Sequence, residues 1–372
     1  MSTLSKDRFF ELDGLRGWAA FLVVAFHMPA FVPALFELNF VRNGYLMVEL
    51  FFVISGFVIY ESYAGSIQTP AQAGRFIWLR FWRLYPIHFV VLMAYLFVEF
   101  AKLVARDRFG IGAVSTTPFV ENSWDAFWAH LFLVHAFTAD ALRFNYPSWS
   151  ISVEFWTYLI FLPLLFLARR FAPWHVFVLA GLLCVGNALL GTPVSLWRGL
   201  AGFSLGLLVA ATRGGPVARR LGPAMAILKG CCLSLYLLLL TIKPPEWRYD
   251  FLFYVPSAML VWVFTQVDGR PSLLAGPLSQ FMGRISYSMY MVHALVFWLA
   301  TQFARLFLTK TEIQLADRSH PALSSLQAGV YIPVVVACVL LSAWMLSKLV
   351  EEPVRLWSRK RFPGAAATRV AG

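Results

Sequence analysis

Arg16 and His27 lie inside the first apolar segment of the chain, eleven positions apart. An α-helix turns about 100° per residue, so both side chains project from one face of a helix through this segment. The spacing also separates them by about 16 Å along the helix axis, roughly half the hydrocarbon thickness of a bilayer. Ionisable groups in a membrane helix are costly and mark functional sites. The pair therefore predicts a guanidinium that binds an anion near one membrane surface and an imidazole that transfers a proton in the interior.

A carboxylate at matching depth is the expected partner of His27. If a span starts outside at Trp149, Glu154 lies about 8 Å below the outer surface, near the expected depth of His27. A carboxylate that fixes the tautomer of a histidine and stabilises its imidazolium is the usual arrangement of a general base, and a structural buried pair is the alternative. Ser150 shares a helix face with Glu154, since they are four positions apart. Glu49 in the second span lies at this depth too, where it either joins the site or neutralises a buried arginine.

A group of arginines precedes the third span, within residues 75–86. Arg80 and Arg83 are three residues apart and project together from a helix. The planar guanidinium donates hydrogen bonds in pairs and therefore suits phosphate. With Arg16, these two residues predict an anion pocket at the cytoplasmic surface. The alternative is an ordinary positively charged loop on the inner side.

A third cluster of polar groups occupies residues 283–293, at the start of the ninth span. Ser286, Tyr287, Tyr290 and His293 are candidates to line a substrate cavity. Hydrogen bonding between neighbouring helices is an equally good interpretation of such residues.

The last apolar run ends in the sequence Glu-Glu-Pro-Val-Arg at 351–355. Proline lacks a backbone N–H and cannot continue a helix from within, so Pro353 is expected to stop this one. The two glutamates are expected to pair with nearby arginines, in a structural role.

The elements that must position these residues are membrane helices. The chain of 372 residues is 59% hydrophobic and 13% charged, with a mean hydropathy of +0.68, whereas soluble domains carry about 25% charged residues. Repeated apolar runs of about 18 or more residues predict an all-α polytopic membrane protein. The expected spans are 12–34, 42–62, 84–104, 149–167, 174–190, 196–212, 229–242, 251–267, 284–308 and 328–350.

The segment 125–141 is apolar but short and contains His130, His135 and Asp140. A full span there would place Arg169 and Arg170 outside, against the positive-inside rule. We therefore expect ten transmembrane helices, one partial or re-entrant helix at 125–141, and both termini in the cytoplasm.

One integral-membrane domain is expected over residues 10–355, with short cytoplasmic tails at 1–9 and 356–372. The net charge of +12 is spread over short loops and forms no basic domain, which argues against a nucleic-acid partner. The cysteines Cys184, Cys231, Cys232 and Cys338 sit in apolar runs without metal-ligand spacing, so we expect packing roles and no metal site.

Together these residues resemble the membrane acyltransferase-3 family, the bacterial integral-membrane O-acyltransferases that decorate surface polysaccharides. The match runs from about Phe10 to Arg355, and its motifs fall in the family's order. These motifs are Leu12-Asp13-Gly14-Leu15-Arg16-Gly17 with His27, Phe51-Phe52-Val53-Ile54-Ser55-Gly56-Phe57, Arg80-x-x-Arg83 with Tyr85-Pro86, Trp149-Ser150 with Glu154, Ile285-Ser286-Tyr287-Ser288-Met289-Tyr290 with His293, and Glu352-Pro353.

The resemblance implies ten helices in the bacterial cytoplasmic (inner) membrane and an acyl-CoA donor, usually acetyl-CoA, that reaches the site from the cytoplasm. It implies transfer to a hydroxyl of a carbohydrate at the outer face, such as an exopolysaccharide or O-antigen, with polysaccharide-assembly proteins as partners. The family's Arg–His pair maps to Arg16 and His27, its Arg-x-x-Arg motif to Arg80 and Arg83, and its Trp-Ser/Glu motif to Glu154.

The expected mechanism uses His27, oriented by Glu154, as the base that deprotonates the acceptor hydroxyl, while Arg16, Arg80 and Arg83 bind the phosphates of coenzyme A. Direct transfer and a transient acyl-enzyme on His27 or a serine both fit this arrangement. A glycan or small-anion transporter, or an assembly subunit without acyl chemistry, is the alternative function, since buried ionisable residues also line transport pathways.

Overall fold

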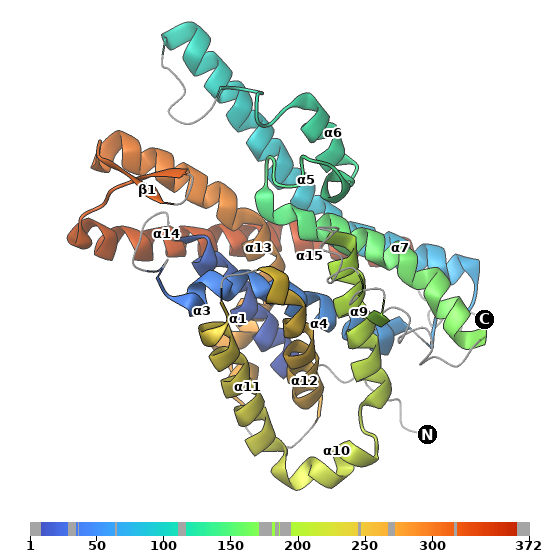
Figure 1. The fold of residues 1–372 in the computed structure, drawn as a ribbon. Helices are drawn as coiled ribbons and strands as arrows, with labels where there is room; N and C mark the ends of the chain where they lie inside the picture. Colours follow the sequence, from blue (N-terminus) through green and yellow to red (C-terminus); the bar gives the residue numbers. More distant parts are fainter. Residues whose placement is uncertain are drawn as a thin grey trace.

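The protein is described by a computed structural model and is almost entirely helical (Figure 1). The structure describes residues 9–28, 35, 37–63, 65–110, 117–170, 181–182, 186, 195–244, 247–266, 272–315 and 318–362. The longer helices are α1 (Phe10–Phe26), α4 (Met47–Tyr63), α5 (Pro70–Phe109), α7 (Trp149–Arg170), α9 (Ser195–Thr212), α11 (Met225–Ile242), α12 (Tyr254–Phe264), α13 (Pro277–Phe303), α14 (Ser325–Leu346) and α15 (Glu352–Arg361).

Shorter elements connect these helices. They are α3 (Asn39–Arg42), η2 (Asn43–Leu46), α6 (Trp124–Leu131), η3 (His135–Phe137), η4 (Tyr146–Ser148), α10 (Pro216–Leu221), η5 (Gly222–Ala224), η6 (Trp247–Phe253), η7 (Leu273–Ala275), η8 (Ala304–Leu308) and η9 (Ser347–Glu351). The strands β1 (Glu312–Leu315) and β2 (Arg318–Pro321) form one antiparallel hairpin, in which Ile313 pairs with His320.

Five helical segments among the described residues are long and apolar enough to cross a membrane, which confirms the predicted helical membrane protein. They are Asn39–Tyr63, Pro70–Phe109, Pro216–Ile242, Pro277–Leu308 and Ser325–Arg361. The apolar helices Leu196–Thr212 and Asp250–Phe264 are shorter. The count of ten spans and the side on which the termini lie stay predictions, and the span expected at 174–190 falls almost wholly outside the described residues.

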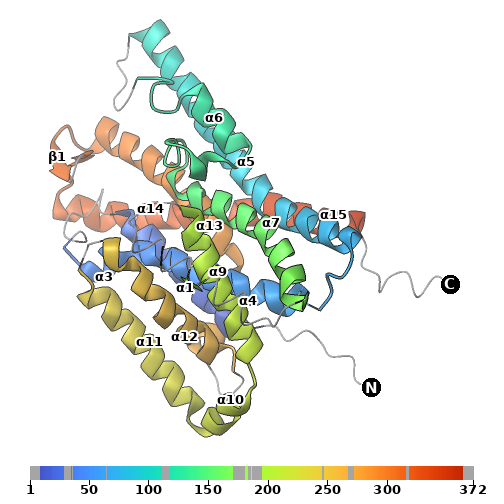
Figure 2. The ribbon, with the colours of Figure 1, turned by 45° about the vertical axis from the view of Figure 1, so that its right-hand side comes forward.

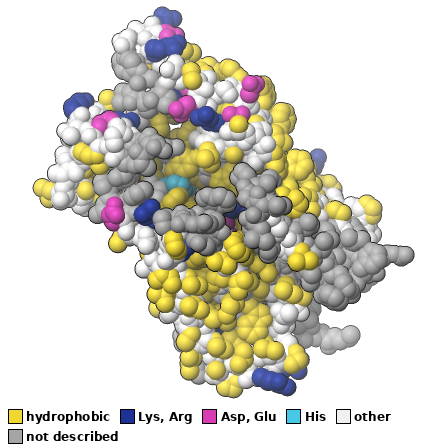
Figure 3. All heavy atoms as spheres, viewed as in Figure 1, with side chains coloured by type: hydrophobic (Ala, Val, Ile, Leu, Met, Phe, Trp, Pro, Cys, Tyr) yellow, Lys and Arg dark blue, Asp and Glu magenta, His cyan; other side chains and the backbone are white. Residues whose placement is uncertain are grey.

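The outer surface of the helices is apolar. Figure 3 shows hydrophobic side chains covering the lower part of the molecule, over α11 and α12, with Lys and Arg side chains at its tip. The exposed residues there include Ile227, Leu235, Leu238, Val255 and Met259. A continuous apolar exterior of this kind suits contact with lipid.

The segment predicted as a partial helix, 125–141, contains the short helices α6 and η3. The Ser123 side chain accepts a hydrogen bond from the Ala126 amide and so caps α6. Eight residues of α-helix rise about 12 Å, which is less than half of the hydrocarbon thickness.

Glycines let two helix pairs approach backbone to backbone, α1 with α13 and α4 with α9 (Figures 1 and 2). A Cβ atom on Gly17 would lie 2.5 Å from the amide nitrogen of Gly283. A Cβ atom on Gly56 would lie 2.1 Å from the carbonyl oxygen of Phe203. Small residues at helix crossings are the usual means of close packing in membranes. Gly17 is next to Arg16, so this crossing brings the Arg16 side chain against α13.

The α5 helix is 40 residues long. Thr69 and Gln72 form a capping box at its start, and Gly110 ends it with a left-handed φ of 62°. The side chains of Arg80 and Arg83 therefore project from the interior of one continuous helix rather than from a loop.

Pro353 does not stop the last helix, contrary to the sequence prediction. The helix continues from α14 through the π-helical turn η9 into α15, and Pro353 lies in the first turn of α15. Proline is tolerated there because the first turn needs no backbone N–H donor, and the π-helical turn shifts the hydrogen-bond pattern just before it.

Helix α15 packs on the first turns of α5. Trp78 Nε1 donates to the Ser358 carbonyl oxygen at 3.2 Å, and Arg75 Nε donates to the Phe362 carbonyl oxygen at 2.9 Å. The ring of Trp357 lies 5.0 Å from that of Trp82. Residues 356–362, expected as part of a tail, are therefore folded against α5.

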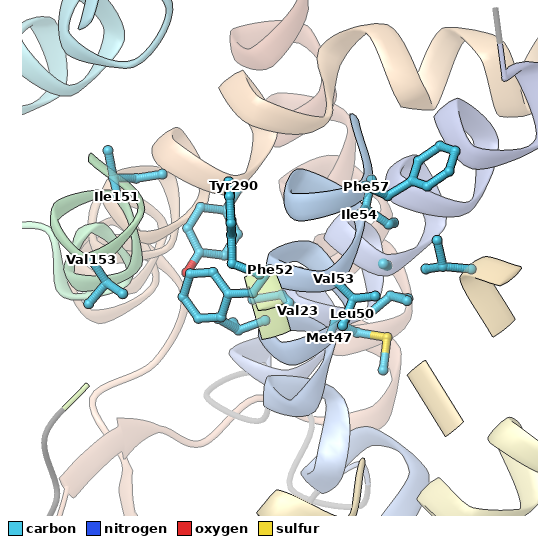
Figure 4. Close-up of a cluster of buried hydrophobic side chains, with 14 of the residues drawn as sticks. Val23, Met47, Leu50, Phe52, Val53, Ile54, Phe57, Ile151, Val153 and Tyr290 are labelled. Carbon is cyan, nitrogen blue, oxygen red and sulfur yellow. The ribbon is translucent and has the colours of Figure 1, made fainter. Parts of the chain in front are cut away.

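The core joins α1, α4, α7 and α13 through buried apolar side chains (Figure 4). Ile151 and Val153 from α7 lie beside Phe52 from α4 and Tyr290 from α13 in that view. Phe52 and Tyr290 are almost fully buried. The side chains of the candidate site therefore stand on helices that are fixed by close packing.

Candidate active site

A cavity of about 780 Å³ lies among α1, α4, α5, α7, α13 and α15. Its apolar walls include Val48, Phe51, Phe52, Ile54 and Ile151. Its lining also contains the arginines Arg16, Arg80, Arg83, Arg213, Arg284, Arg355 and Arg359 and the acids Asp13, Glu61, Glu154, Glu351 and Glu352. A space of this size, half apolar and rich in guanidinium groups, can hold an elongated ligand with a negatively charged end.

Arg16 lines the cavity and is held in place by hydrogen bonds to α13. Its Nε donates to Ser286 Oγ at 3.1 Å, and its Nη2 donates to the Gly283 carbonyl oxygen at 3.2 Å and to Asp13 Oδ1 at 3.3 Å. Ser286 in turn donates to the Gly283 carbonyl oxygen at 2.9 Å. The guanidinium is held in one orientation and retains further donors that can face the cavity.

Arg80 and Arg83 line the same cavity as Arg16, as their sequence pattern predicts. The guanidinium of Arg80 lies 4.9 Å from the ring centre of Tyr63 and 5.9 Å from that of Tyr158. The Nε of Arg80 is buried and has no hydrogen-bond partner among the described residues. A buried, unpaired donor in a cationic cavity favours a bound anion as its partner.

Glu154 is placed in this cavity by two hydroxyl donors. Ser55 Oγ donates to Glu154 Oε1 at 2.9 Å, and the Tyr158 hydroxyl donates to the same oxygen. Glu154 lies four residues beyond Ser150 on α7, about 6 Å further along the helix. Its position is therefore one helical turn beyond Ser150, toward the C-terminal end of α7.

Tyr290 and Ser150 contact each other in the wall of the cavity. Their hydroxyl oxygens are 2.8 Å apart, and the Tyr290 hydroxyl donates to the Pro147 carbonyl oxygen at 2.9 Å. Tyr287, three residues before Tyr290 on α13, donates to the carbonyl oxygen of Leu84 on α5. Ser150, Tyr287 and Tyr290 thus line the cavity and also join helices, which combines both interpretations of these residues.

His27 lies next to His293, one turn beyond Tyr290 on α13. His27 Nδ1 is 3.1 Å from His293 Nε2 and 3.0 Å from the Val23 carbonyl oxygen. The two rings are 5.0 Å apart, and the ring of Tyr146 lies 4.8 Å from that of His27. Arg16 and His27 both contact α13, in agreement with their eleven-residue separation.

The hydrogen bonds of this pair define the tautomer of His27. A carbonyl oxygen only accepts, so the contact with Val23 places a hydrogen on His27 Nδ1. His293 Nδ1 faces the Met289 carbonyl oxygen at 3.3 Å, so it also carries a hydrogen, and His293 Nε2 accepts from His27. The lone pair of His27 is therefore on Nε2, the state in which an imidazole can accept a proton.

Glu49 forms an ion pair with Arg198, whose side chain is 34% exposed. Arg198 Nε donates to Glu49 Oε1 at 2.9 Å, and the Glu49 side chain is almost fully buried. The Arg198 guanidinium also lies 4.9 Å from the ring centre of Trp149. This pair connects α4 and α9 at the start of α7, which is the structural interpretation of Glu49.

Sequence reasoning missed the contribution of the last helix and the partner of His27. Arg355 and Arg359 face the cavity only because α15 continues past Pro353 and packs on α5. Glu351, expected to pair with an arginine, accepts a hydrogen bond from Ser288 at 2.9 Å. A signal for His293 is present: Gly283 and His293 are ten residues apart on α13, nearly the spacing of Arg16 and His27 on α1.

The arrangement can bind an anion at one end and accept a proton at the other. About 16 Å of helix separates Arg16 from His27, and Tyr290 lies between Ser286 and His293, the α13 residues that contact them. Arg16 and Tyr290 line the cavity, whereas His27 and His293 lie beyond its described lining. Among the described residues, no group of three or more His, Cys, Asp or Glu side chains has the geometry to hold a metal ion.

Comparison with known proteins gives one family and several relatives. A family model described as an acyltransferase domain, acyltransferase 3, matches residues 9–347. The chain is 26% identical to the acyltransferase MdmB of Streptomyces mycarofaciens over 389 residues, which cover 94% of this chain and 93% of MdmB. No solved structure matches the chain.

Two other relatives are covered over less than half of their length. The chain is 38% identical over 96 residues to Protein 2 in the picA locus of Rhizobium radiobacter, covering 25% of this chain and 46% of that protein. It is 24% identical over 315 residues to the O-acetyltransferase OatA of Staphylococcus aureus strain NCTC 8325, covering 76% of this chain and 49% of OatA.

Proposed function

The chain belongs to the acyltransferase 3 family, and on this premise we propose that it transfers an acetyl group from cytoplasmic acetyl-CoA to a hydroxyl of a carbohydrate outside the membrane. It is a membrane O-acyltransferase. We further propose that it lies in the bacterial inner membrane. The acceptor is a surface polysaccharide or O-antigen, and proteins of polysaccharide assembly deliver it.

The arginine-lined cavity supports coenzyme A as the carrier of the acyl group. Its phosphates suit Arg80, Arg83 and Arg16, which line the cavity. The uncharged pantetheine arm runs along the apolar wall toward Tyr290. The presence of several arginines and an apolar wall in one cavity is the observation that carries the proposal.

His27 acts as the general base. Its Nε2 accepts the proton of the acceptor hydroxyl, and the hydroxyl oxygen attacks the thioester carbonyl carbon. The carbon–sulfur bond breaks, the ester forms, and the thiolate of coenzyme A takes up the proton from the imidazolium. The thioester carbonyl lies at the contact between the Ser150 and Tyr290 side chains, which line the cavity.

Glu154 and His293 assist His27 in different ways. His293 Nε2 accepts from His27 Nδ1 and keeps the lone pair on His27 Nε2. The hydrogen bonds of Glu154 go to Ser55 and Tyr158, so its carboxylate stabilises the imidazolium through charge.

A reconstituted assay tests the proposal. The purified protein in lipid nanodiscs receives acetyl-CoA and surface polysaccharide from a strain that lacks the gene. Release of free thiol is followed by absorbance, and O-acetyl groups on the polymer are counted by proton NMR. We expect equal amounts of the two products with the unchanged protein.

His27→Ala is expected to lower the rate by about a hundredfold or more, the usual contribution of a general base, while coenzyme A binding stays unchanged. His320→Ala, in the β-hairpin, is the matched control and keeps full activity. Thiol release without acylated polymer would refute the acceptor. Full activity of His27→Ala would refute the base, and polymer export without any thiol release would favour transport.

A further inference from the structure

We propose that Arg355 and Arg359 of α15 form the part of the phosphate site at the rim of the cavity. They bind the monoester phosphate on the ribose of coenzyme A. This inference rests on the proposed acyl-CoA donor. It assigns a ligand to two residues that lie outside the Arg-x-x-Arg motif and beyond the family match, which ends at residue 347.

Four arginines from two packed helices meet at this end of the cavity. Arg80 and Arg83 come from α5, and Arg355 and Arg359 come from α15. Residues four apart on a helix project together, so Arg355 and Arg359 form one pair and Arg80 and Arg83 another. The two helices are held in contact by the rings of Trp78, Trp82 and Trp357.

No direct ion pair holds the arginines of this cluster in the described part of the chain, although Glu154 and Glu351 line the same cavity. Among the described residues, none of the four arginines forms an ion pair with a carboxylate within 4.0 Å. The nearby acids have other partners: Glu352 binds Lys348 at 2.8 Å, and Glu351 accepts from Ser288 at 2.9 Å.

Two donors in the cluster are buried and lack partners among the described residues. They are Nε of Arg80 and Nε of Arg355, one on each helix. An unpaired buried donor costs free energy unless a ligand completes it. One donor on each side of the cavity points to an anion with several oxygens that bridges α5 and α15.

The order of the arginines along the cavity indicates which part of the donor each one meets. Arg359 is exposed, whereas Arg355, Arg80, Arg83 and Arg16 are half-buried, so the α15 pair extends to the rim. Arg16 is held by Ser286 on α13, one turn before Tyr290. A ligand whose thioester reaches Tyr290 leaves its nucleotide at the rim. The diphosphate then lies at Arg80 and Arg83, and the ribose monoester phosphate lies at Arg355 and Arg359.

Binding of coenzyme A and of dephospho-coenzyme A, which lacks the monoester phosphate, tests the assignment. Both are titrated by calorimetry into the full-length protein in nanodiscs of neutral lipid. The unchanged protein is expected to bind coenzyme A at least tenfold more tightly, since hydrogen bonds to charged groups are strong.

The double variant Arg355→Gln/Arg359→Gln is expected to bind coenzyme A about tenfold more weakly and dephospho-coenzyme A as before, so the preference disappears. Retained binding of dephospho-coenzyme A shows that the variant is folded. Arg361→Gln, exposed on the same helix, is the control and keeps the preference.

Each remaining outcome overturns a defined claim. Equal loss of affinity for both ligands, or an unchanged preference in the double variant, refutes the role of α15 and leaves the acyl-CoA donor intact. Absence of coenzyme A binding by the unchanged protein refutes the donor itself. Binding that is abolished when the nanodiscs contain anionic lipid assigns the rim arginines to lipid phosphates instead.

Discussion

His27 is the proposed general base, and its neighbours determine what it can do. Its Nδ1 faces the Val23 carbonyl oxygen and His293 Nε2. This arrangement does for a membrane histidine what a carboxylate does in the usual catalytic pair: it selects the tautomer and the ring orientation. It does so without placing a second charge at that depth, where an ionised group is costly.

Loss of His293 is therefore expected to lower turnover without weakening donor binding. His293→Ala removes the acceptor for His27 Nδ1 and should reduce the rate of thiol release by about tenfold to a hundredfold, the lower range of general-base effects. His293→Gln offers a carbonyl acceptor and should recover part of that loss. Initial rates and coenzyme A affinity are measured for each variant. A parallel fall in affinity would mean that His293 only supports packing.

The functional groups could be located from the sequence more readily than their partners. Arg16, Arg80 and Arg83 were expected in one pocket, and the structure places all three around one cavity. Glu154 was expected beside His27 instead, but it lines this cavity and accepts hydrogen bonds from Ser55 and Tyr158. Residue type and helical spacing suffice for the arginines, because ionisable groups are costly in membrane helices and gather where they face a cavity or one another. Which side chain lies beside His27 depends instead on how far α1 and α13 are shifted along each other. The spacing of residues within one helix carries no information about that shift.

At the level of helices, the glycines next to the functional residues explain how the site is assembled. Gly14 and Gly17 flank Arg16, and Gly283 precedes Ser286. A Cβ atom added to any of these three glycines would lie 2.0–2.5 Å from a backbone atom of the element packed against it. The approach of α1 to α13 thus brings Arg16 within hydrogen-bond distance of Ser286.

Gly17→Ala is expected to destabilise the protein even though alanine favours a helix. The added methyl group would overlap the backbone at Gly283 and should cost about 1–3 kcal/mol, as overpacking usually does. Gly230→Ala on α11 is the matched control, because its Cβ would meet nothing within 4 Å. Thermal unfolding in detergent compares the two. Equal unfolding temperatures would show that α1 and α13 can move apart freely.

The end of the chain shows where local rules mislead. Proline in the interior of a helix removes a hydrogen bond and clashes with the preceding turn, and so Pro353 was expected to stop the helix. The π-helical turn at Ser347–Glu351 places Pro353 in a first turn, where both costs vanish. A π-helical turn leaves no clear pattern in composition, so the position of Arg355 and Arg359 could not be predicted.

The whole molecule separates two tasks along one axis. The arginines gather where α5 and α15 meet, and the imidazoles lie one turn beyond the contact of Tyr290 with Ser150. Under the proposed function, a donor that enters at the arginines and an acceptor that arrives at His27 meet at this contact. Neither substrate needs to cross the full thickness of the membrane.

This arrangement makes the stability of the protein depend on its donor. In the absence of an anion, the four arginines at the α5–α15 junction repel one another, and a bound ligand with several phosphates removes that repulsion. A ligand that binds only the folded state stabilises it by RT ln(1 + [L]/Kd), about 2.7 kcal/mol at a hundred times Kd. Coenzyme A at that concentration is thus expected to raise the unfolding temperature by several degrees, and to raise it less at high salt because ions screen partly exposed charges.

Arg83→Gln should reduce this shift in unfolding temperature, whereas Arg220→Gln on α10, away from the cavity, should not. Pantetheine, which lacks the phosphates, should have little effect. An equal shift with pantetheine would place the binding energy in the apolar part of the cavity and contradict the role given to the arginines.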